Sequence, residues 1–141
     1  GAMTAALAER IDTEAIRSFF DSDLGVLVLD PGNRVRREWP FTVGLPASEA
    51  DAELESQTGT DLATDELVVV QGIIDMLVET PAGLVVIDFK TDRVAEAELN
   101  ERAEAYRQQL ELYAKAAGDI LQQPITAKWL YFLALRRAVQ V

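Results

Sequence analysis

The chain has 141 residues, of which 49% are apolar, and a formal net charge of −11. This length fits one domain built around a single core. The sequence contains no cysteine and no histidine, which excludes disulfides, zinc ribbons, cysteine-ligated iron–sulfur clusters and histidine-dependent catalytic triads. Carboxylates are the strongest metal ligands left, so we expect any bound metal to be an oxygen-preferring cation such as Mg²⁺ or Mn²⁺.

Acidic residues are concentrated in one stretch. Residues 44–66 carry seven acidic side chains and no Lys or Arg. A negative net charge argues against an independent nucleic-acid binder, which normally presents a basic face, but outside this stretch the charges are closer to balance. Because residues 44–64 are polar and have no regular hydrophobic period, we predict an acidic mobile loop there.

The amino-terminal part is predicted to be helix followed by strands. Residues 1–3 are interpreted as a cloning remnant, so the single domain is expected to span residues 4–141. Asp12 or Thr13 would cap a short helix that ends before Gly25. Residues 26–29 are predicted to be extended and residues 31–33 to turn. Residues 34–43 are predicted to form a strand, with Pro40 at an edge or bulge.

The rest of the chain is predicted to form a hairpin, a long helix and two strands. Residues 67–79 and 84–90 are β-rich, and Thr80-Pro81-Ala82-Gly83 between them suits a type I turn. Residues 94–120 have high helix propensity and one apolar face: Leu99, Ala103, Tyr106, Leu110, Tyr113 and Ala117. Residues 127–135 and 138–141 follow as strands. This order predicts an α/β (or α+β) fold with a mixed sheet flanked by helices, and no segment is apolar enough to span a membrane. We therefore expect a soluble, cytoplasmic protein.

Charged side chains interrupt the two apolar strands of the hairpin. With a two- or four-residue loop, facing residues have numbers that sum to 163, so Asp75 would face Asp88. Facing carboxylates repel each other, and a divalent cation between them would turn this repulsion into ligation. Lys90 follows Asp88 by two residues and would therefore lie on the same sheet face, where it suits phosphodiester hydrolysis. A three-residue loop with a bulge at Gly83 is the rival geometry and would separate the carboxylates.

Five short blocks, in order along the chain, resemble the PD-(D/E)xK nuclease superfamily. The likeness is greatest to the carboxy-terminal nuclease domain of the AddA-type helicase–nucleases, with RecB more distant. The blocks are Arg37-Glu38-Trp39-Pro40-Phe41, Gly72-Ile73-Ile74-Asp75, Val86-Ile87-Asp88-Phe89-Lys90-Thr91-Asp92, Gln109-Leu110-Glu111-Leu112-Tyr113 and Lys128-Trp129-Leu130-Tyr131. D-x-K alone is common by chance, whereas the ordered set is specific.

The resemblance implies a restriction-endonuclease-like fold and assigns roles to site residues. Asp75 and Asp88 would bind Mg²⁺ or Mn²⁺ together with the backbone carbonyl of Phe89, without an iron–sulfur cluster. Lys90 would be the catalytic lysine, and Glu38 an acidic residue beside the site. The alternative for Asp88 and Lys90 is a local ion pair at a solvent-exposed strand end, and for Glu38 it is a strand-edge charge paired with Arg36 or Arg37.

The resemblance also implies contacts with DNA. Gln109 and Tyr113 match a Q-x-x-x-Y motif that lies near the active site, and they share a helix face because they are four residues apart. Without the resemblance, Tyr113 would be interpreted as a core aromatic of that face. Independently of the resemblance, Gly72 permits close approach of backbone to substrate or to a packed helix, and the alternative is a glycine at a bulge.

The function implied is that of a metal-dependent nuclease domain of an ATP-dependent helicase–nuclease that processes DNA double-strand ends for recombinational repair. DNA, a helicase domain and a partner subunit would be its partners. The sequence has no G-x-x-x-x-G-K-[ST] loop, so ATP would act only through a helicase portion outside this chain. Relatives carry an upstream helix with a metal-binding histidine, and this chain contains none. We therefore expect a domain truncated at its amino terminus or a site without that ligand. The alternative is an inactive nuclease-fold module that guides DNA or docks protein.

Overall fold

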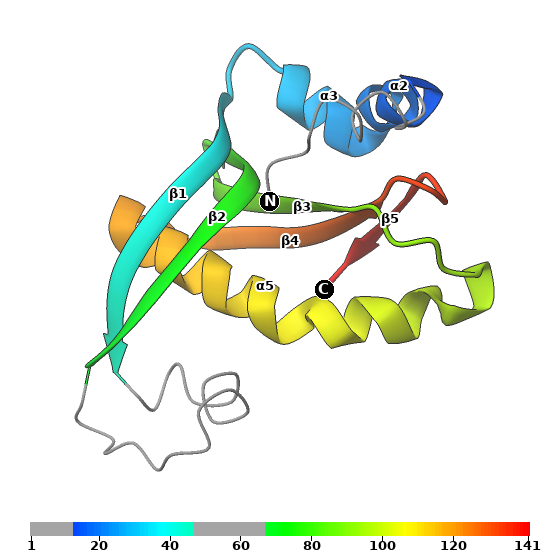
Figure 1. Cartoon of the computed structure of the whole chain (residues 1–141). Coiled ribbons are helices and arrows are strands. Elements are labelled where there is room, and N and C mark those ends of the chain that lie inside the picture. The colour runs from blue at the N-terminus through cyan, green and yellow to red at the C-terminus, as the bar shows by residue number, and fades with distance from the viewer. Residues whose placement is uncertain (1–12, 47–66) are drawn as a thin grey trace.

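The computed structural model describes residues 13–46 and 67–141. Its elements in chain order are α2 (Thr13–Asp21), α3 (Asp23–Leu29), β1 (Arg34–Pro46), β2 (Leu67–Thr80), β3 (Gly83–Lys90), the 3-10 helix η1 (Glu96–Glu98), α5 (Leu99–Leu121), β4 (Ile125–Phe132) and β5 (Arg137–Gln140). The strands form one sheet in the order β1-β2-β3-β4-β5 (Figure 1). β3 and β4 are parallel, and the other neighbouring pairs are antiparallel. The predicted mixed sheet flanked by helices is confirmed.

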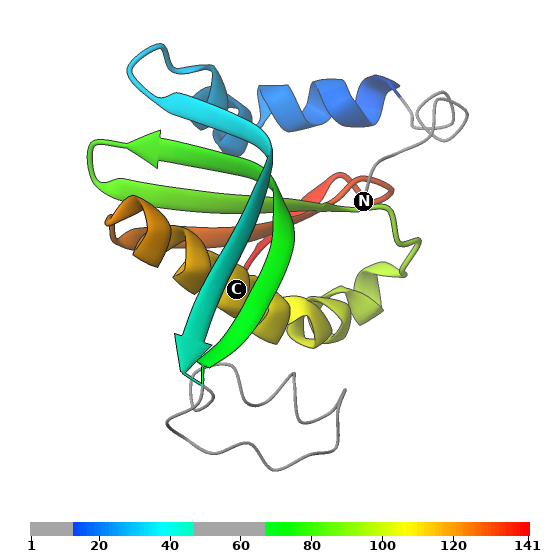
Figure 2. The ribbon, with the colours of Figure 1, turned by 60° about the vertical axis from the view of Figure 1, so that its left-hand side comes forward.

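The sheet separates two apolar layers. α2 and α3 cover one face, and α5 crosses the other (Figures 1 and 2). On the first face Phe19 and Val28 pack with Met76 and Ile87. On the second face Leu110 packs in a layer that α5 shares with the sheet. Because β3 is buried from both sides, its apolar run is continuous, as expected for a central strand.

The long connection from β3 to β4 determines where α5 lies. A parallel pair of strands requires a crossover, and η1 with α5 provides it. The predicted apolar face of the helix is confirmed, since all six of its residues are buried or partly buried in the α5 layer. The predicted start at residue 94 is wrong, because η1 precedes α5 and the α-helix begins at Leu99. The helix continues one residue beyond the predicted end, to Leu121.

The extended segment predicted for residues 26–29 is wrong. These residues complete α3, and Gly25 lies inside this helix rather than at the end of the preceding one. Ser22 caps α3, because its hydroxyl accepts a hydrogen bond from the Gly25 N–H at 3.3 Å. Leu24 and Val28, four residues apart, are both buried. Local capping and packing against the sheet therefore outweigh the β propensity of a short Val- and Leu-rich run.

The bounds of β1 and β4 also differ from the prediction. β1 continues through Gly44 to Pro46, so the first residues of the predicted acidic loop are strand, and residues 47–64 of that loop lie outside the described residues. β4 begins at Ile125 and ends at Phe132, and the next four residues form a turn. Pro40 is accommodated as predicted, because β1 is an edge strand.

The alternation of side chains along β2 is interrupted once. Ile74 and Leu77 are three positions apart, yet both belong to the α5 layer, whereas Met76 belongs to the opposite layer. On β1 the interruption coincides with Glu38, which has a φ of 47°. In the register of the two strands Glu38 falls opposite Asp75, and the neighbouring positions on either side remain paired. The ribbon of β1 and β2 therefore changes direction at the position of these two carboxylates.

Candidate functional site

The hairpin of β2 and β3 brings the two predicted ligands together. Its paired residues run from Thr80 opposite Gly83 to Met76 opposite Ile87, and each pair sums to 163. The next position in this register sets Asp75 against Asp88. The loop therefore has two residues, as one prediction required, and the three-residue alternative with a bulge at Gly83 is wrong. A backbone φ of 143° at Gly83 explains why glycine occupies the first position after the loop.

Asp75 is a partly buried carboxyl in an unfavourable electrostatic setting. Burial, a hydrogen bond with Asp88 and the charge of Asp88 raise the pKa of Asp75 from 3.8 to about 7. The backbone N–H of Phe89 donates to Asp75 Oδ2 at 2.9 Å and acts in the opposite direction. Two facing carboxylates thus share a partly desolvated space, and positive charge placed between them would relieve their repulsion.

Lys90 supplies positive charge at the same place. Its Nζ lies 2.7 Å from Asp88 Oδ2, and the two side chains are only 16% and 18% exposed. The Nζ also lies 3.9 Å from the centroid of the Tyr106 ring on α5. The Leu133 N–H donates to the Lys90 carbonyl at 3.0 Å, which fixes the backbone at the end of β3. Asp88 and Lys90 therefore point to the α5 side of the sheet, as their spacing predicted.

The donor set fits an oxygen-preferring cation. Mg²⁺ retains several waters and commonly uses only one or two protein carboxylates. Asp75 and Asp88 therefore provide the type and number of protein ligands that this cation uses. Across residues 13–46 and 67–141, no group of three or more Asp and Glu side chains could hold a metal. Glu38 thus does not complete a three-carboxylate set in this structure. Its side chain is exposed, although its backbone lies opposite Asp75.

The predicted substrate-binding residues lie together on the α5 side of β1 and β2. Tyr113 packs edge to face against Phe41, with ring centroids 5.1 Å apart, and the Gln109 Nε2 lies 3.5 Å from the Tyr113 hydroxyl. A Cβ added at Gly72 would lie 2.7 Å from Tyr113 Cζ. Among the interpretations of Gly72, close approach of a packed helix is therefore present in the structure. Tyr113 also has the core packing expected of its helix face.

Tyr106 borders Lys90, and Asp92 and Arg102 are joined to Tyr106 through the Asp92 carboxylate. The sequence does not single out these three residues individually. The Tyr106 hydroxyl donates to Asp92 Oδ2 at 2.7 Å, and the Arg102 Nη1 donates to the same oxygen at 2.8 Å. Asp92 lies two residues after Lys90, and the other two residues are on α5. Tyr106 is predicted from the sequence only as part of an apolar helix face. The D-x-K-x-D spacing was the available signal for Asp92, but its partners depend on how α5 packs.

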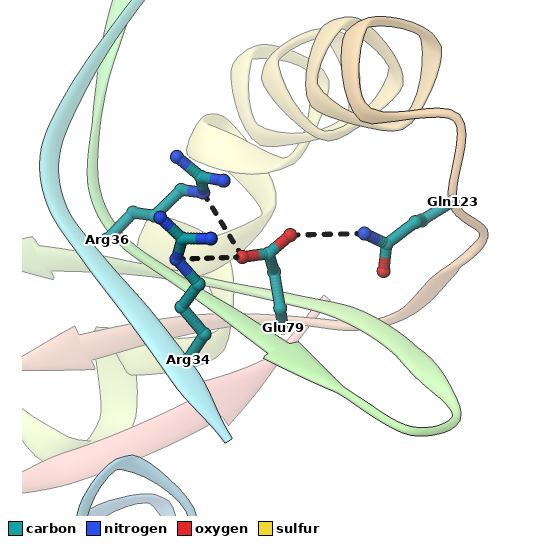
Figure 3. Close-up of polar contacts among 4 residues, drawn as sticks. All are labelled: Arg34, Arg36, Glu79 and Gln123. Atoms are coloured by element: carbon teal, nitrogen blue, oxygen red, sulfur yellow. Dashed lines mark hydrogen bonds and ion pairs between the residues drawn. The ribbon is translucent and has the colours of Figure 1, made fainter. Parts of the chain in front are cut away.

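A second polar cluster joins the opposite end of the hairpin to β1 and to the end of α5 (Figure 3). Glu79 Oε2 lies 3.2 Å from Arg36 Nε and 3.7 Å from Arg34 Nε. Glu79 Oε1 accepts a hydrogen bond from Gln123 Nε2 at 3.1 Å. The cluster connects β1, β2 and the α5–β4 connection, so it helps to fix the strand register that places Asp75.

In the described residues no helix has the length and apolarity needed to cross a membrane.

Comparison with known proteins gives consistent matches. The family model for the PD-(D/E)XK nuclease superfamily matches residues 3–139. The chain is 41% identical over 149 aligned residues to the A subunit of the ATP-dependent helicase/nuclease of Bacillus cereus strain AH187, and 37% identical over 143 to that of Levilactobacillus brevis strain ATCC 367. Each alignment covers 99% of this chain and 11% of the relative, so the chain spans about a tenth of the length of these relatives. The predicted resemblance to AddA-type helicase–nucleases is confirmed, and the chain belongs to the PD-(D/E)XK nuclease superfamily.

Proposed function

We propose that residues 4–141 form a metal-dependent deoxyribonuclease domain that hydrolyses phosphodiester bonds at the end of the β2–β3 hairpin. The observation that carries this proposal is the position of two facing, partly buried carboxylates beside an ammonium group. Asp75 and Asp88 lie at the next facing position beyond the paired residues of β2 and β3 and interact there through their side chains. Lys90 Nζ lies 2.7 Å from Asp88 Oδ2. Two facing carboxylates are electrostatically unfavourable for folding, so their presence is best explained by a chemical role.

Asp75 and Asp88, together with the backbone carbonyl of Phe89, would hold Mg²⁺ or Mn²⁺. When bound, such a cation neutralises charge on the scissile phosphate and makes a bound water more acidic. The raised pKa of Asp75 supports this assignment, because burial and Asp88 disfavour a second negative charge in the absence of positive charge. The Phe89 N–H restrains the Asp75 carboxylate through its hydrogen bond, which keeps one ligand oriented toward its partner.

Lys90 would be the catalytic lysine. Its ammonium lies beside the Asp88 carboxylate, where it can orient a water and stabilise the charge that develops on the phosphate during hydrolysis. Water then adds to phosphorus as the bond to the leaving oxygen breaks. Glu38 is proposed as an auxiliary acidic residue, because its backbone lies opposite Asp75 in the register of β1 and β2.

DNA would approach along the α5 side of β1 and β2. Gln109 and Tyr113 are the proposed DNA-contacting residues, and their proximity across one helical turn supports a shared role. Gly72 would permit the close approach of backbone and Tyr113 that sets the shape of this surface.

The names of the relatives support a place in a larger assembly. Each is named as the A subunit of an ATP-dependent helicase/nuclease, and we propose that this chain supplies nuclease activity beside a helicase and a partner subunit. ATP would be used only by the helicase. In the cytoplasm the assembly would process DNA double-strand ends for recombinational repair. A net charge of −11 fits a domain that receives DNA from a motor rather than capturing it alone.

A second candidate is a nuclease fold that guides DNA or docks a partner without cleaving. One observation favours it: among the residues the structure describes, no third carboxylate joins Asp75 and Asp88. This candidate predicts DNA or partner binding that is unchanged when Asp88 and Lys90 are replaced. The nuclease proposal predicts loss of cleavage.

The test is cleavage of linear single- and double-stranded DNA by this chain with Mg²⁺ or Mn²⁺ and with EDTA. Asp75→Asn, Asp88→Asn and Lys90→Met should each abolish metal-dependent cleavage, because each removes a ligand or the ammonium while nearly preserving side-chain shape. Asp119→Asn is the matched control, since Asp119 is an exposed carboxylate near the far end of α5. Cleavage that survives all three site substitutions, or persists in EDTA, would refute the proposal.

A further inference from the structure

We infer that Tyr106 is a positioning residue that holds the Lys90 ammonium at the site through its ring and is itself anchored by Asp92 through its hydroxyl. This inference rests on the proposed nuclease function for its catalytic consequence. The geometry on which it stands is independent of that function.

The ring of Tyr106 is a direct neighbour of the ammonium. Lys90 Nζ lies 3.9 Å from the ring centroid, well within the ~6 Å range in which the negative face of an aromatic ring attracts a cation. Both side chains are partly buried, so the attraction is less screened than it would be at the surface. Lys90 is therefore held between the Asp88 carboxylate and an aromatic face.

The other end of the same ring is fixed by hydrogen bonds. The Tyr106 hydroxyl donates to Asp92 Oδ2 at 2.7 Å, and Arg102 donates to this oxygen at 2.8 Å. Asp92 belongs to the segment that leaves β3, two residues after Lys90, whereas Tyr106 and Arg102 lie one turn apart on α5. The ring is thus restrained by the segment that follows the lysine it contacts.

A neutral partner for Lys90 matters because its charged partner, Asp88, has a second proposed role. In this structure Lys90 pairs with Asp88 at 2.7 Å, and the same carboxylate is a proposed cation ligand. A cation bound by Asp88 would compete with the ammonium for this carboxylate and would repel it. The Tyr106 ring carries no charge, so it attracts Lys90 without competing for the cation. We therefore expect the ring to keep the ammonium beside the site when Asp88 is engaged.

The first test reads the contact directly and needs neither metal nor DNA. The chain has three lysines, Lys90, Lys115 and Lys128, so a sample labelled at the lysine ε-carbons gives three methylene signals, and Lys90→Arg assigns one of them. An aromatic face shields protons above it. The Lys90 signal should therefore be shifted upfield in the unaltered chain, less in Tyr106→Phe, and not at all in Tyr106→Leu. The other two lysines are internal references.

The second test measures catalysis in the same variants at saturating DNA and Mg²⁺. Tyr106→Leu should lower kcat about tenfold, the size expected for loss of one partly buried cation–π contact. Tyr106→Phe keeps the ring but loses the anchor, so it should lower kcat only about two- to threefold. KM for DNA should change little in both variants. Thermal unfolding of each variant sets an assay temperature at which all are folded.

The outcomes separate this inference from the proposed function. A Lys90 signal that is the same in the unaltered chain and in Tyr106→Leu would overturn the positioning role, whatever the activity. Equal kcat values for the Phe and Leu variants would also overturn it. If the unaltered chain does not cleave DNA, the proposed function fails for this chain, and the spectroscopic test still decides whether Tyr106 holds Lys90.

Discussion

Replacing Asp75 with Asn should stabilise the metal-free protein above pH 7 and have little effect near pH 4. In the folded protein the pKa of Asp75 is raised to about 7, chiefly by burial and then by Asp88. In the unfolded chain the carboxyl has its ordinary pKa near 3.8. Stability associated with this group is therefore fully present below about pH 4 and is lost as pH rises through 7. Asn cannot ionise, so the variant should not lose this stability.

The size of this difference in stability depends on the shift in the pKa of Asp75 and on the exposure of its side chain. A rise in pKa from 3.8 to about 7 would correspond to roughly 4 kcal/mol if it were fully expressed in the free energy of unfolding. Asp75 is only partly buried, and solvent screening reduces electrostatic effects at such positions. We therefore expect Asp75→Asn to be about 1–2 kcal/mol more stable than the unaltered chain at pH 8.5, and nearly equal to it near pH 4.

Urea unfolding in EDTA, followed by circular dichroism at several pH values, measures this difference. Ionisable groups that do not interact with Asp75 titrate alike in both proteins, so their contribution to the difference cancels. Asp119→Asn is the control, and its stability should follow that of the unaltered chain across the pH range. A difference between Asp75→Asn and the unaltered chain that is constant with pH, or that has the opposite sign, would refute the reasoning.

Three further substitutions test the packing around the site by urea unfolding. Gly72→Ala should lower the free energy of unfolding by about 1–3 kcal/mol, because its Cβ would lie 2.7 Å from Tyr113 Cζ; an unchanged stability would show that the helix does not approach so closely. Glu79→Ala should cost about 1–2 kcal/mol by leaving Arg36 without its carboxylate partner, and no loss would contradict the cluster in Figure 3. Hydrogen bonds from Tyr106 and Arg102 lower the pKa of Asp92, so Asp92→Asn should be destabilising at pH 7. This loss should diminish as pH falls below about 4, whereas a loss independent of pH would argue against those bonds.

The parts of the site that sequence predicted are those set by local rules. Once the loop consists of Pro81 and Ala82, the pairing of β2 and β3 sets the hairpin register up to Met76 and Ile87. The next position in this register is the one at which Asp75 faces Asp88. The spacing of Asp88 and Lys90 places them on one face because side chains alternate along a strand. The period of the long helix predicted its buried face because amphipathic spacing records which side is covered.

The features that the sequence did not predict depend on how the helices and strands pack against one another. The contact of Tyr106 with Lys90 joins α5 to the end of β3, and no spacing rule specifies how a crossover helix rotates against its sheet. The left-handed backbone at Glu38 belongs to a change in direction of two strands, which a period-two pattern does not record. The short apolar run of residues 26–29 suits strand and helix equally until its packing is known, so the sequence does not reveal that these residues complete α3.

Cation binding by the two facing carboxylates is the central claim, and calorimetric titration of the protein with Mn²⁺ tests it most directly. We predict one site in the unaltered chain at pH 7.5. Affinity should fall at least about tenfold in Asp75→Asn and in Asp88→Asn, the loss expected when one of few charged ligands is removed. Asp119→Asn should bind as the unaltered chain does. Equal binding by all four proteins, or no binding by any, would contradict the account.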